Sequence, residues 1–340
     1  MPADNREEPL VPQRGRIEPR ALFFFEKWYF DGQTEDGAFF FAYLAPLVLA
    51  GRRSAELVVS LFPAGGNEHR LSLHLAGGVV ESNAERTRVA LPGGEIELGS
   101  AHCRVRLRLE QADLDLSYRP LEPPWAPRGD GILLGRGRRR LRWVVPLPLG
   151  RLQGSVRVRD GEQRFDGLGY ADFVQTDIAP WSLPLRELVW GRALAEDLVV
   201  VWNRVSFRPG SQCLPGLGDT VGLGLARLGT AGETLSLAGA EAELGEMQQH
   251  TRTGGAYPRE LRLRLGAAQE IDLRLDDTRL LLGERVADVQ GFGSGPQHWL
   301  YRKLTGDAVE YKLLSRMTAA GRTALAAHEV VHWGCHAPAP

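Results

Sequence analysis

Lysine, cysteine and long apolar segments are all scarce in this sequence. Only three of its 41 lysine and arginine residues are lysine, and its formal net charge is −1. No global electric field therefore attracts the chain to nucleic acid or to an anionic membrane. The cysteines, Cys103, Cys213 and Cys335, are far apart and form no C-x-x-C motif. This argues against a disulfide framework and favours a reducing, cytoplasmic location.

Apolar runs long enough to cross a membrane are missing as well. The longest, residues 38–51, is too short to span a bilayer and contains Pro46. Residues 1–19 are polar, so we expect a frayed or disordered tail there and no signal peptide. No long, capped helical pattern occurs, and the best short candidate for a helix is residues 238–250.

The dominant pattern is an alternation of apolar and polar residues with a period of two. Residues 103–110 show it clearly, because every second side chain there is charged. The pattern recurs at residues 54–62, 69–75, 87–98, 154–161, 260–266, 270–277 and 308–317. Clusters of turn-forming residues predict hairpin connections at 63–67, 92–95, 159–162 and 275–278. Many short strands with frequent turns indicate an all-β fold, an antiparallel sandwich or barrel.

A domain boundary is predicted near the middle of the chain. Pro180 and Pro184 interrupt the strand pattern there, and 340 residues are enough for two domains. After the tail, we expect an N-terminal lipocalin-like β domain over residues 20–184 and a C-terminal one over residues 185–340. We find no convincing sequence repeat between them.

Two stretches carry a resemblance to a known family. The first contains E-x-W-Y-F-D at residues 26–31. The second contains P-x-G-x-x-x-G at residues 148–154, G-x-G-Y-x-D at residues 167–172 and W-G-R at residues 190–192. With this order and spacing, the chain resembles the carotenoid 1,2-hydratases (hydroxyneurosporene synthases) and their lipocalin-like relatives, which include fungal Diels–Alderases. The resemblance covers about residues 20–205 and implies two lipocalin-like halves with an apolar ligand and no cofactor.

Hydration or cyclisation of an alkene begins with protonation of the double bond, which needs an acid kept away from water. A carboxyl group in an apolar pocket keeps its proton because burial disfavours the charged form. Asp172 of the G-x-G-Y-x-D motif is the first candidate for this acid, and Asp177 is the second. Tyr170 would bind the acid or deliver water. The competing interpretation of Asp172 is a turn cap or an acceptor of backbone N–H bonds.

Aromatic side chains in the matched segments would line the pocket and stabilise a carbocation through their π faces. An arginine there would orient a polar end of the ligand. The candidate substrate-binding residues are Trp28, Tyr29, Phe173, Trp190, Arg192 and Trp202. Their structural alternatives are ordinary core packing for the aromatic residues and an ion pair for the arginine.

The leading hypothesis is a cofactor-independent acid–base enzyme, a hydratase or a cyclase or isomerase, acting on an apolar polyene, terpenoid or polyketide-like molecule in a β-barrel cavity. The family usually continues its Asp with His-Asn-Trp-Gly, whereas Asp172 is followed by Phe-Val-Gln-Thr. This departure keeps two alternatives open, a non-catalytic carrier of a lipophilic ligand and a pericyclase that works by shape. Peripheral contact with a membrane, to collect the substrate, is compatible with all three, and the sequence does not define the oligomeric state.

Two further motifs point to other chemistry. Residues 135–143 (GRGRRRLRW) are interpreted as a solvated loop leading into a strand, not as a nucleic-acid site. H-E-x-x-H, formed by His328, Glu329 and His332 and followed by His336, would bind zinc if it lay on a helix. Two valines inside the motif favour a strand, in which the first two imidazoles lie about 13 Å apart. No metal is therefore expected, and a zinc site remains the alternative.

Overall fold

The computed structural model describes two compact β units. It describes residues 23–49, 52–75, 79–82, 86–91, 93–99, 102–136, 139–179, 182, 185–208, 219–230, 232–266, 271–289, 299, 302 and 308–333. The chain divides into residues 1–178 (unit 1) and residues 179–340 (unit 2). The break comes shortly before the boundary expected at residues 184 and 185. The predicted tail at residues 1–19 lies outside the described part of the chain.

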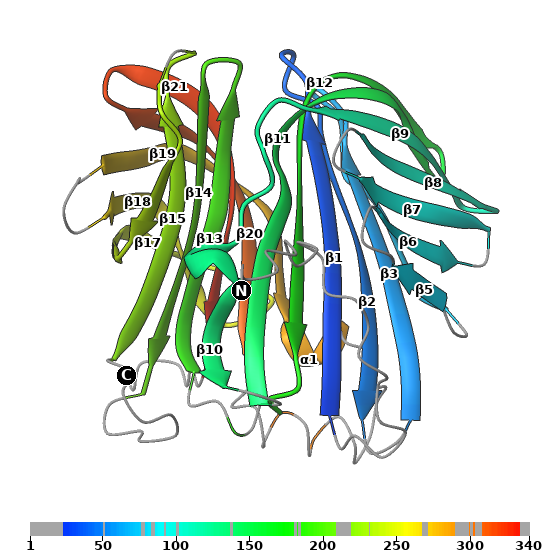
Figure 1. Cartoon of the computed structure of the whole chain (residues 1–340), viewed down its shortest axis with the longest axis horizontal. Helices are drawn as coiled ribbons and strands as arrows, with labels where there is room; N and C mark the ends of the chain where they lie inside the picture. The colour runs from blue at the N-terminus through cyan, green and yellow to red at the C-terminus, as the bar shows by residue number, and fades with distance from the viewer. Residues whose placement is uncertain are drawn as a thin grey trace, which may run out of the picture. The chain divides into compact units, whose positions relative to one another are not determined.

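Unit 1 forms one curled antiparallel sheet, a half-barrel (Figure 1). Its strand order is β4-β3-β2-β1-β12-β11-β9-β8-β7-β6-β5, and β10 pairs with β11 outside this path. A 3₁₀ turn spans Pro127–Gly129. The strands are β1 (Phe23–Gln33), β2 (Phe39–Leu49), β3 (Arg52–Phe62), β4 (His69–Leu75), β5 (Val79–Ser82), β6 (Arg86–Leu91), β7 (Gly94–Gly99), β8 (Cys103–Leu109), β9 (Ala112–Pro120), β10 (Ile132–Arg136), β11 (Arg139–Val158) and β12 (Gly161–Thr176).

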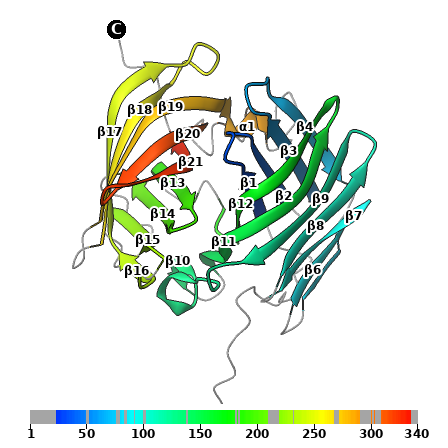
Figure 2. The ribbon, with the colours of Figure 1, turned by 90° about the horizontal axis from the view of Figure 1, so that it is seen from above.

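Unit 2 repeats this arrangement with nine strands in its sheet, in the order β16-β15-β14-β13-β21-β20-β19-β18-β17. In both units the first four strands form a meander, and the first of these strands pairs with the last strand of the unit (Figure 2). The elements are β13 (Leu185–Ala195), β14 (Leu198–Phe207), β15 (Thr220–Leu228), β16 (Leu235–Ala238), β17 (Ala240–Gln249), β18 (Ala256–Leu265), β19 (Ile271–Arg285), α1 (Val286–Val289), β20 (Val309–Ala319) and β21 (Arg322–His332).

The predicted all-β fold with two lipocalin-like antiparallel halves is therefore confirmed, and each half is a curled sheet that forms a half-barrel. Two local predictions were wrong. Residues 238–250, the candidate helix, contain strand β17, which pairs with β18 from Ala240 to Gln249 except at Glu246. Residues 275–278, a predicted hairpin turn, lie inside β19. The sheet register with β20 shifts there and Asp277 adopts a positive φ of 50°, so the turn-forming residues produce a bulge.

Each sheet buries one face in a core of its own unit. In unit 1, Trp28 and Phe30 of β1 and Phe173 of β12 belong to this core. A void beside Phe30 and Leu57 measures only about 10 Å³, which is close to the space of one water molecule. Side chains thus fill this part of the interior, and no room for a polyene remains in it.

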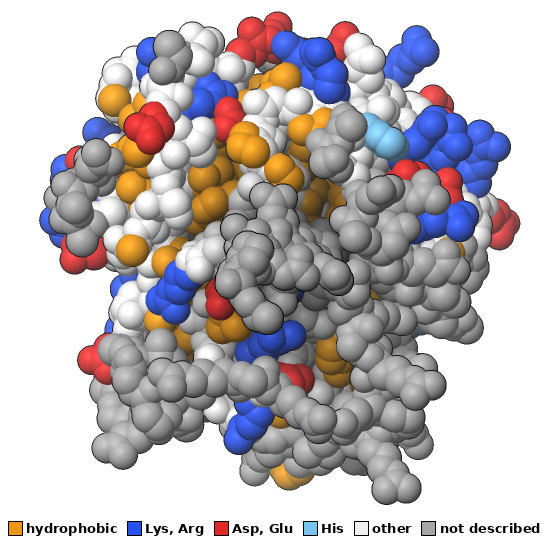
Figure 3. Space-filling view, in the orientation of Figure 1, with side chains coloured by type: hydrophobic (Ala, Val, Ile, Leu, Met, Phe, Trp, Pro, Cys, Tyr) orange, Lys and Arg blue, Asp and Glu red, His pale blue; other side chains and the backbone are white. Residues whose placement is uncertain are grey.

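The solvent-facing strands carry opposite charges in close succession (Figure 3). Arg88 bonds to Glu95 between β6 and β7, and Arg262 bonds to Asp272 between β18 and β19. Cross-strand pairs of this kind stabilise a sheet modestly.

Among the described helices, none has the length and hydropathy that a membrane crossing requires. Cys103 is a buried free thiol, and the other two cysteines lie outside the described residues.

Two glycines of the matched motifs are required by close packing. The ring of Tyr118 lies over Gly169 on the core face of unit 1. In unit 2, the indole of Trp202 lies over Gly191, and the Cβ of His328 approaches it from the neighbouring strand. A methyl group at either position would overlap these neighbours, so these motif residues are needed for packing as well as for any chemistry of the motifs.

Replacing Gly191 by alanine should therefore lower the free energy of unfolding by about 1–3 kcal/mol, the usual cost of overpacking a core. Gly245 in β17 is a matched control. A Cβ there meets its nearest neighbour, the Cβ of Glu260, at an ordinary 3.4 Å. Urea denaturation of Gly191→Ala and Gly245→Ala measures both changes. Equal stabilities for the two variants would contradict this account of the W-G-R motif.

Candidate functional site

The pairing of β1 with β12 creates two distinct faces at the centre of the unit 1 sheet. Trp28 lies opposite Phe173 on the core face, and Tyr29 lies opposite Asp172 on the other face. Neighbouring residues of a strand point to opposite sides of the sheet, so Asp172 and Phe173 are separated by the backbone itself. We call the side that carries Tyr29, Phe41, Tyr43, Tyr170 and Asp172 the aromatic face.

Asp172 is the chemically distinctive residue of this face. It is 5% exposed, and burial raises the pKa of its carboxyl group from 3.8 to about 7. The charge of Lys27 and hydrogen bonds from Trp143 and Tyr170 lower the pKa, and the nearby Asp31 raises it. Burial dominates these opposing effects. The carboxyl group is thus half protonated near neutral pH, which is the condition for a general acid at that pH.

The hydrogen bonds at Asp172 distinguish its two oxygens. The indole Nε1 of Trp143 and the hydroxyl of Tyr170 both donate to Oδ2, each at 3.1 Å. Since Oδ2 accepts both bonds, the proton of the neutral acid belongs on Oδ1. The arrangement therefore holds the carboxyl group in one orientation and gives Oδ1 the transferable proton.

Aromatic rings extend from this acid across the neighbouring strands. The ring centroids of Tyr29 and Tyr170 are 6.3 Å apart, those of Tyr29 and Phe41 are 6.4 Å apart, and those of Phe41 and Tyr43 are 6.5 Å apart. Nζ of Lys27 lies 5.6 Å from the Tyr29 ring centroid and 5.1 Å from that of Tyr43. These rings already place their π faces toward one positive charge, as a wall that stabilises a cation would do.

The structure separates the other candidates of the first unit from this site. Trp28 and Phe173 pack together in the core with ring centroids 4.4 Å apart. The carboxylate of Asp177, just beyond β12, accepts the backbone N–H of Arg140 at 2.8 Å. This bond ties the end of β12 to the start of β11. The structure therefore brings together Asp172, Tyr170 and Tyr29 of the predicted set.

The candidates in unit 2 fall on two faces as well. Trp202 is fully buried in the unit 2 core. Trp190 and Arg192 alternate with the core residues of β13 and are also buried. Arg192 donates a hydrogen bond to the carbonyl of Leu325, which is a structural contact.

The histidine motif lies on β21, as the strand interpretation predicted. His328 Nε2 is 2.8 Å from the hydroxyl of Ser315, whereas Glu329 lies on the other face and pairs with Lys312 at 2.6 Å. His332 approaches Glu187 at 3.6 Å, and His336 is outside the described residues. Across the described ranges, no group of three or more His, Cys, Asp or Glu residues has the geometry of a metal site.

Trp143, Lys27 and Asp31 are neighbours of Asp172 that the sequence did not indicate. Trp143 ended the basic segment interpreted as a solvated loop, but it is fully buried and packs edge-on against Trp125 at 5.4 Å. Alternation along β1 could have indicated Lys27 and Asp31, because each is two positions from Tyr29 and therefore lies on the same face of the sheet. Alternation could not indicate Trp143, because the register between β11 and β12 shifts and the residues opposite Trp143 cannot be counted from the sequence.

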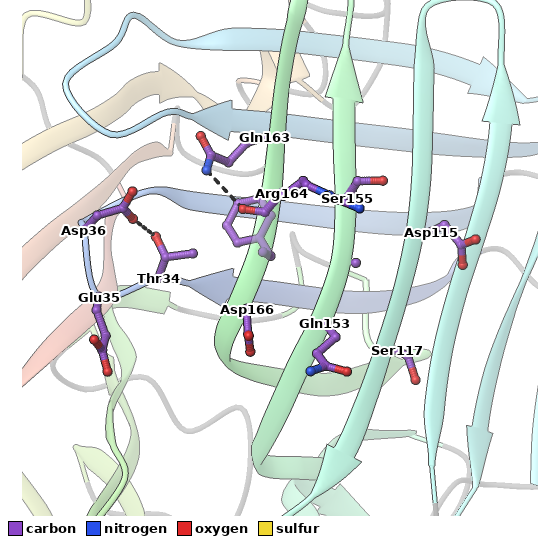
Figure 4. Close-up of a pocket in the computed structure, with 12 residues that line it drawn as sticks. Thr34, Glu35, Asp36, Asp115, Ser117, Gln153, Ser155, Gln163, Arg164 and Asp166 are labelled. Carbon is purple, nitrogen blue, oxygen red and sulfur yellow. Dashed lines mark hydrogen bonds between the residues drawn. The ribbon is translucent and has the colours of Figure 1, made fainter.

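Unit 1 also has an open, polar groove, away from the aromatic face. Its volume is about 810 Å³, and Figure 4 shows Glu35, Asp36, Asp115 and Asp166 around Arg164 along its walls. Thr34 bonds to Asp36 at one side of this groove. Carboxylates and amides without an enclosing apolar wall do not suit an apolar ligand. The buried rings of the aromatic face match the chemistry of an apolar ligand more closely than these groups do.

Comparison with known proteins defines the class of fold. No protein-family model and no curated protein sequence matches the chain. A candidate AttH from Nitrosomonas europaea matches with a TM-score of 0.64 and 15% identity, over 96% of this chain and 99% of that one. CghA, solved with Sch210972, matches with a TM-score of 0.66 and 12% identity, over 96% and 94%. Kievitone hydratase from Nectria haematococca matches with a TM-score of 0.55 and 14% identity, over 91% and 88%.

At these identities the likeness establishes a shared fold, and it does so for nearly the whole chain. The sequence resemblance ended near residue 205, whereas the structural match extends the shared fold to most of the remaining chain, which resembled the family only in being rich in strands. Function does not follow from the fold and has to be argued from the site.

The Tyr170→Phe variant should raise the pKa of Asp172 by about one unit, because it removes a hydrogen bond that stabilises the carboxylate. Tyr118→Phe is the matched control, since Tyr118 is equally buried but packs in the core. The pKa is measured by ¹³C NMR titration of the aspartate carboxyl carbons, with Asp172→Asn identifying the resonance. A lowered or unchanged pKa in Tyr170→Phe would exclude the proposed bond.

The Asp172→Asn variant should gain stability relative to the wild type as the pH rises from about 4 to about 8. A folded pKa raised above the unfolded value stabilises the fold at low pH, and this contribution is lost as the pH rises through the folded value of about 7. The neutral amide avoids that loss, so the variants should diverge by about 2–4 kcal/mol. Denaturation curves at several pH values test this, and a constant offset would contradict it.

Proposed function

We propose that this protein is a cofactor-independent acid catalyst that protonates a carbon–carbon double bond of an apolar polyene or terpenoid. The single observation that carries the proposal is the buried carboxyl group of Asp172, whose pKa is raised to about 7 and whose Oδ2 accepts two hydrogen bonds. The neutral acid is a proton donor that burial keeps from exchanging freely with water. A hydratase among the structural neighbours supports the proposal at the level of the fold.

The proposed reaction begins at Oδ1 of Asp172. The π electrons of the alkene take the proton, the O–H bond breaks, and its electron pair stays on the carboxylate. Trp143 and Tyr170 stabilise the charge that forms at Oδ2. The rings of Tyr29 and Tyr43 stabilise the carbocation through their π faces. In hydration, water adds to the cation and returns a proton. In cyclisation or isomerisation, a second double bond adds to the cation or a neighbouring C–H bond loses its proton.

The first step distinguishes this proposal from its alternatives. A pericyclase that works by shape requires no proton transfer, and a carrier changes no bond. Proton-initiated chemistry carried out in D₂O must place one deuterium on carbon in the product.

Native mass spectrometry and an absorption spectrum of protein from its own host identify the bound compound. A panel of linear polyenes and prenyl compounds extends the assay.

Asp172→Asn should lower kcat by at least about 100-fold, the usual contribution of a general acid, while Kd for the substrate stays within a few-fold of the wild type. Wild-type kcat should fall tenfold per pH unit above about 7, because the carboxyl group then loses its proton. Asp177→Asn tests the second candidate acid.

Deuterium in the product together with loss of activity in Asp172→Asn would support the proposal. A product without deuterium would indicate a pericyclase. Binding without any product in both proteins would indicate a carrier. Normal turnover by Asp172→Asn would exclude Asp172 as the proton donor.

A further inference from the structure

The polar groove of unit 1 has room for a ligand, and the proposed acid chemistry makes no use of it. Its volume of about 810 Å³ lies within the usual range of small-molecule pockets, roughly 300–1,000 Å³. Strands β9, β11 and β12 and the turn between β1 and β2 supply its walls (Figure 4). All of its lining residues except Phe165 are exposed or half-buried, so a ligand reaches them directly from solvent.

The sheet register arranges the polar side chains of the groove in two parallel rows. Residues opposite one another on β9, β11 and β12 form these rows: Ser117, Gln153 and Asp166 in the first, and Asp115, Ser155 and Arg164 in the second. Each row crosses two strand spacings and is therefore about 10 Å long. The rows are two residues apart along each strand, which separates them by about 7 Å. Core residues alternate with these positions, so the rows lie on the face away from the core.

Most of these groups are left unpaired by the sheet itself. In the described part of the chain, five side chains form no hydrogen bond or ion pair with another residue, namely Ser117, Gln153, Ser155, Arg164 and Asp166. Immediately outside the rows the same face is ion-paired, because Asp113 of β9 lies 3.9 Å from Arg157 of β11. The groove therefore offers donors and acceptors that cross-strand pairing has not used.

The charges around the groove nearly cancel. Arg164 lies in the groove, and Arg104 and Arg106 of β8 approach Asp115 at 3.5 and 3.7 Å. These three guanidinium groups face four carboxylates, those of Glu35, Asp36, Asp115 and Asp166. A balance so close to neutral provides little attraction for a polycation, and it favours an uncharged polar ligand.

The donor and acceptor types define the chemistry of that ligand. Carboxylate and amide oxygens accept hydrogen bonds, guanidinium and amide nitrogens donate them, and hydroxyl groups do both. A ligand that satisfies such a mixture carries many groups that both donate and accept, which is the chemistry of a sugar.

We propose that this groove binds a neutral saccharide, either a short oligosaccharide or a segment of a glycan chain. The carboxylate of Asp166 accepts hydrogen bonds from two neighbouring hydroxyl groups, and Gln153 and Arg164 bond to hydroxyl groups farther along the chain. The ring of Phe165 packs edge-on against Phe40 in the core at 4.8 Å, so it does not stack on the sugar. The site is separate from Asp172, and the proposal goes beyond the acid chemistry.

The test is saturation-transfer difference NMR on the full chain with four neutral trisaccharides, cellotriose, maltotriose, mannotriose and xylotriose. Titration of the trisaccharide that binds most tightly gives Kd for the wild type, Gln153→Ala, Asp166→Ala and Asp113→Ala, at low and at high salt. Asp113→Ala is the matched control, because it removes a carboxylate from the same face of β9 outside the groove lining.

The wild type should bind with Kd of about 0.1–1 mM, as suits an open groove without an aromatic wall. Gln153→Ala and Asp166→Ala should each raise Kd about 5- to 10-fold, the effect of about one lost hydrogen bond. Asp113→Ala should bind as the wild type does. High salt should leave Kd unchanged, because screening does not act on an uncharged ligand.

Failure of the wild type to bind any of the four trisaccharides would overturn the proposal, as would unchanged Kd values in both groove variants. Binding that is lost at high salt, or that spermine displaces, would assign the groove to cations instead. The deuterium experiment at Asp172 is independent of these results. Saccharide binding without deuterium transfer would support the groove and refute the acid.

Discussion

The pairing of β1 with β12 is the constraint on which the rest of unit 1 depends. It joins the opening strand of the unit to its last strand and sets Tyr29 opposite Asp172 and Asp31 opposite Tyr170. A slip of this register by one residue would exchange the two faces, placing the carboxyl group of Asp172 in the hydrocarbon core and Phe173 on the aromatic face. The glycines at this pairing, Gly32 and Gly169, lie opposite each other and leave space for the rings of Phe40 and Tyr118.

The two units build the same topology and give different environments to comparable carboxyl groups. Asp172 lies on the last strand of unit 1 and Glu329 on the last strand of unit 2, each on the face away from its core. Burial outweighs the hydrogen bonds and the nearby Lys27 at Asp172, so its carboxyl group retains its proton near neutral pH. Glu329 instead pairs with the ammonium of Lys312, which also contacts Glu310. An opposite charge favours the ionised form, so the environments drive these two groups toward different protonation states.

Much of the fold was predictable because alternation is a local property. A period of two marks strands directly, and it identified β4 over residues 69–75 with its observed bounds. The errors arose where local preference competed with pairing. The Glu- and Ala-rich segment of β17 has side chains that favour helices, yet it forms an edge strand, and the Asp-Asp pair in β19 forms a bulge inside a longer strand.

The candidate site was predictable in part, for a related reason. The matched motif pointed to Asp172 and Tyr170, but adjacency in sequence suggested Phe173 as a neighbour, and a strand places that residue on the opposite side. Trp143 donates to Asp172 across 29 positions of sequence through a strand pair with irregular register. No local pattern reports such a contact. It follows only from the positions of the bulges in β11.

The same closing strand pair has a consequence for how the chain folds. β1 cannot complete its pairing until residues 161–176 have been synthesised, and β13 of unit 2 waits in the same way for residues 322–332. Each unit closes through contacts between residues far apart in sequence, which places it among slowly folding topologies. During synthesis, the first strand of each meander therefore exposes an unpaired edge for most of the time its unit is on the ribosome. That edge is the element most in need of protection from aggregation.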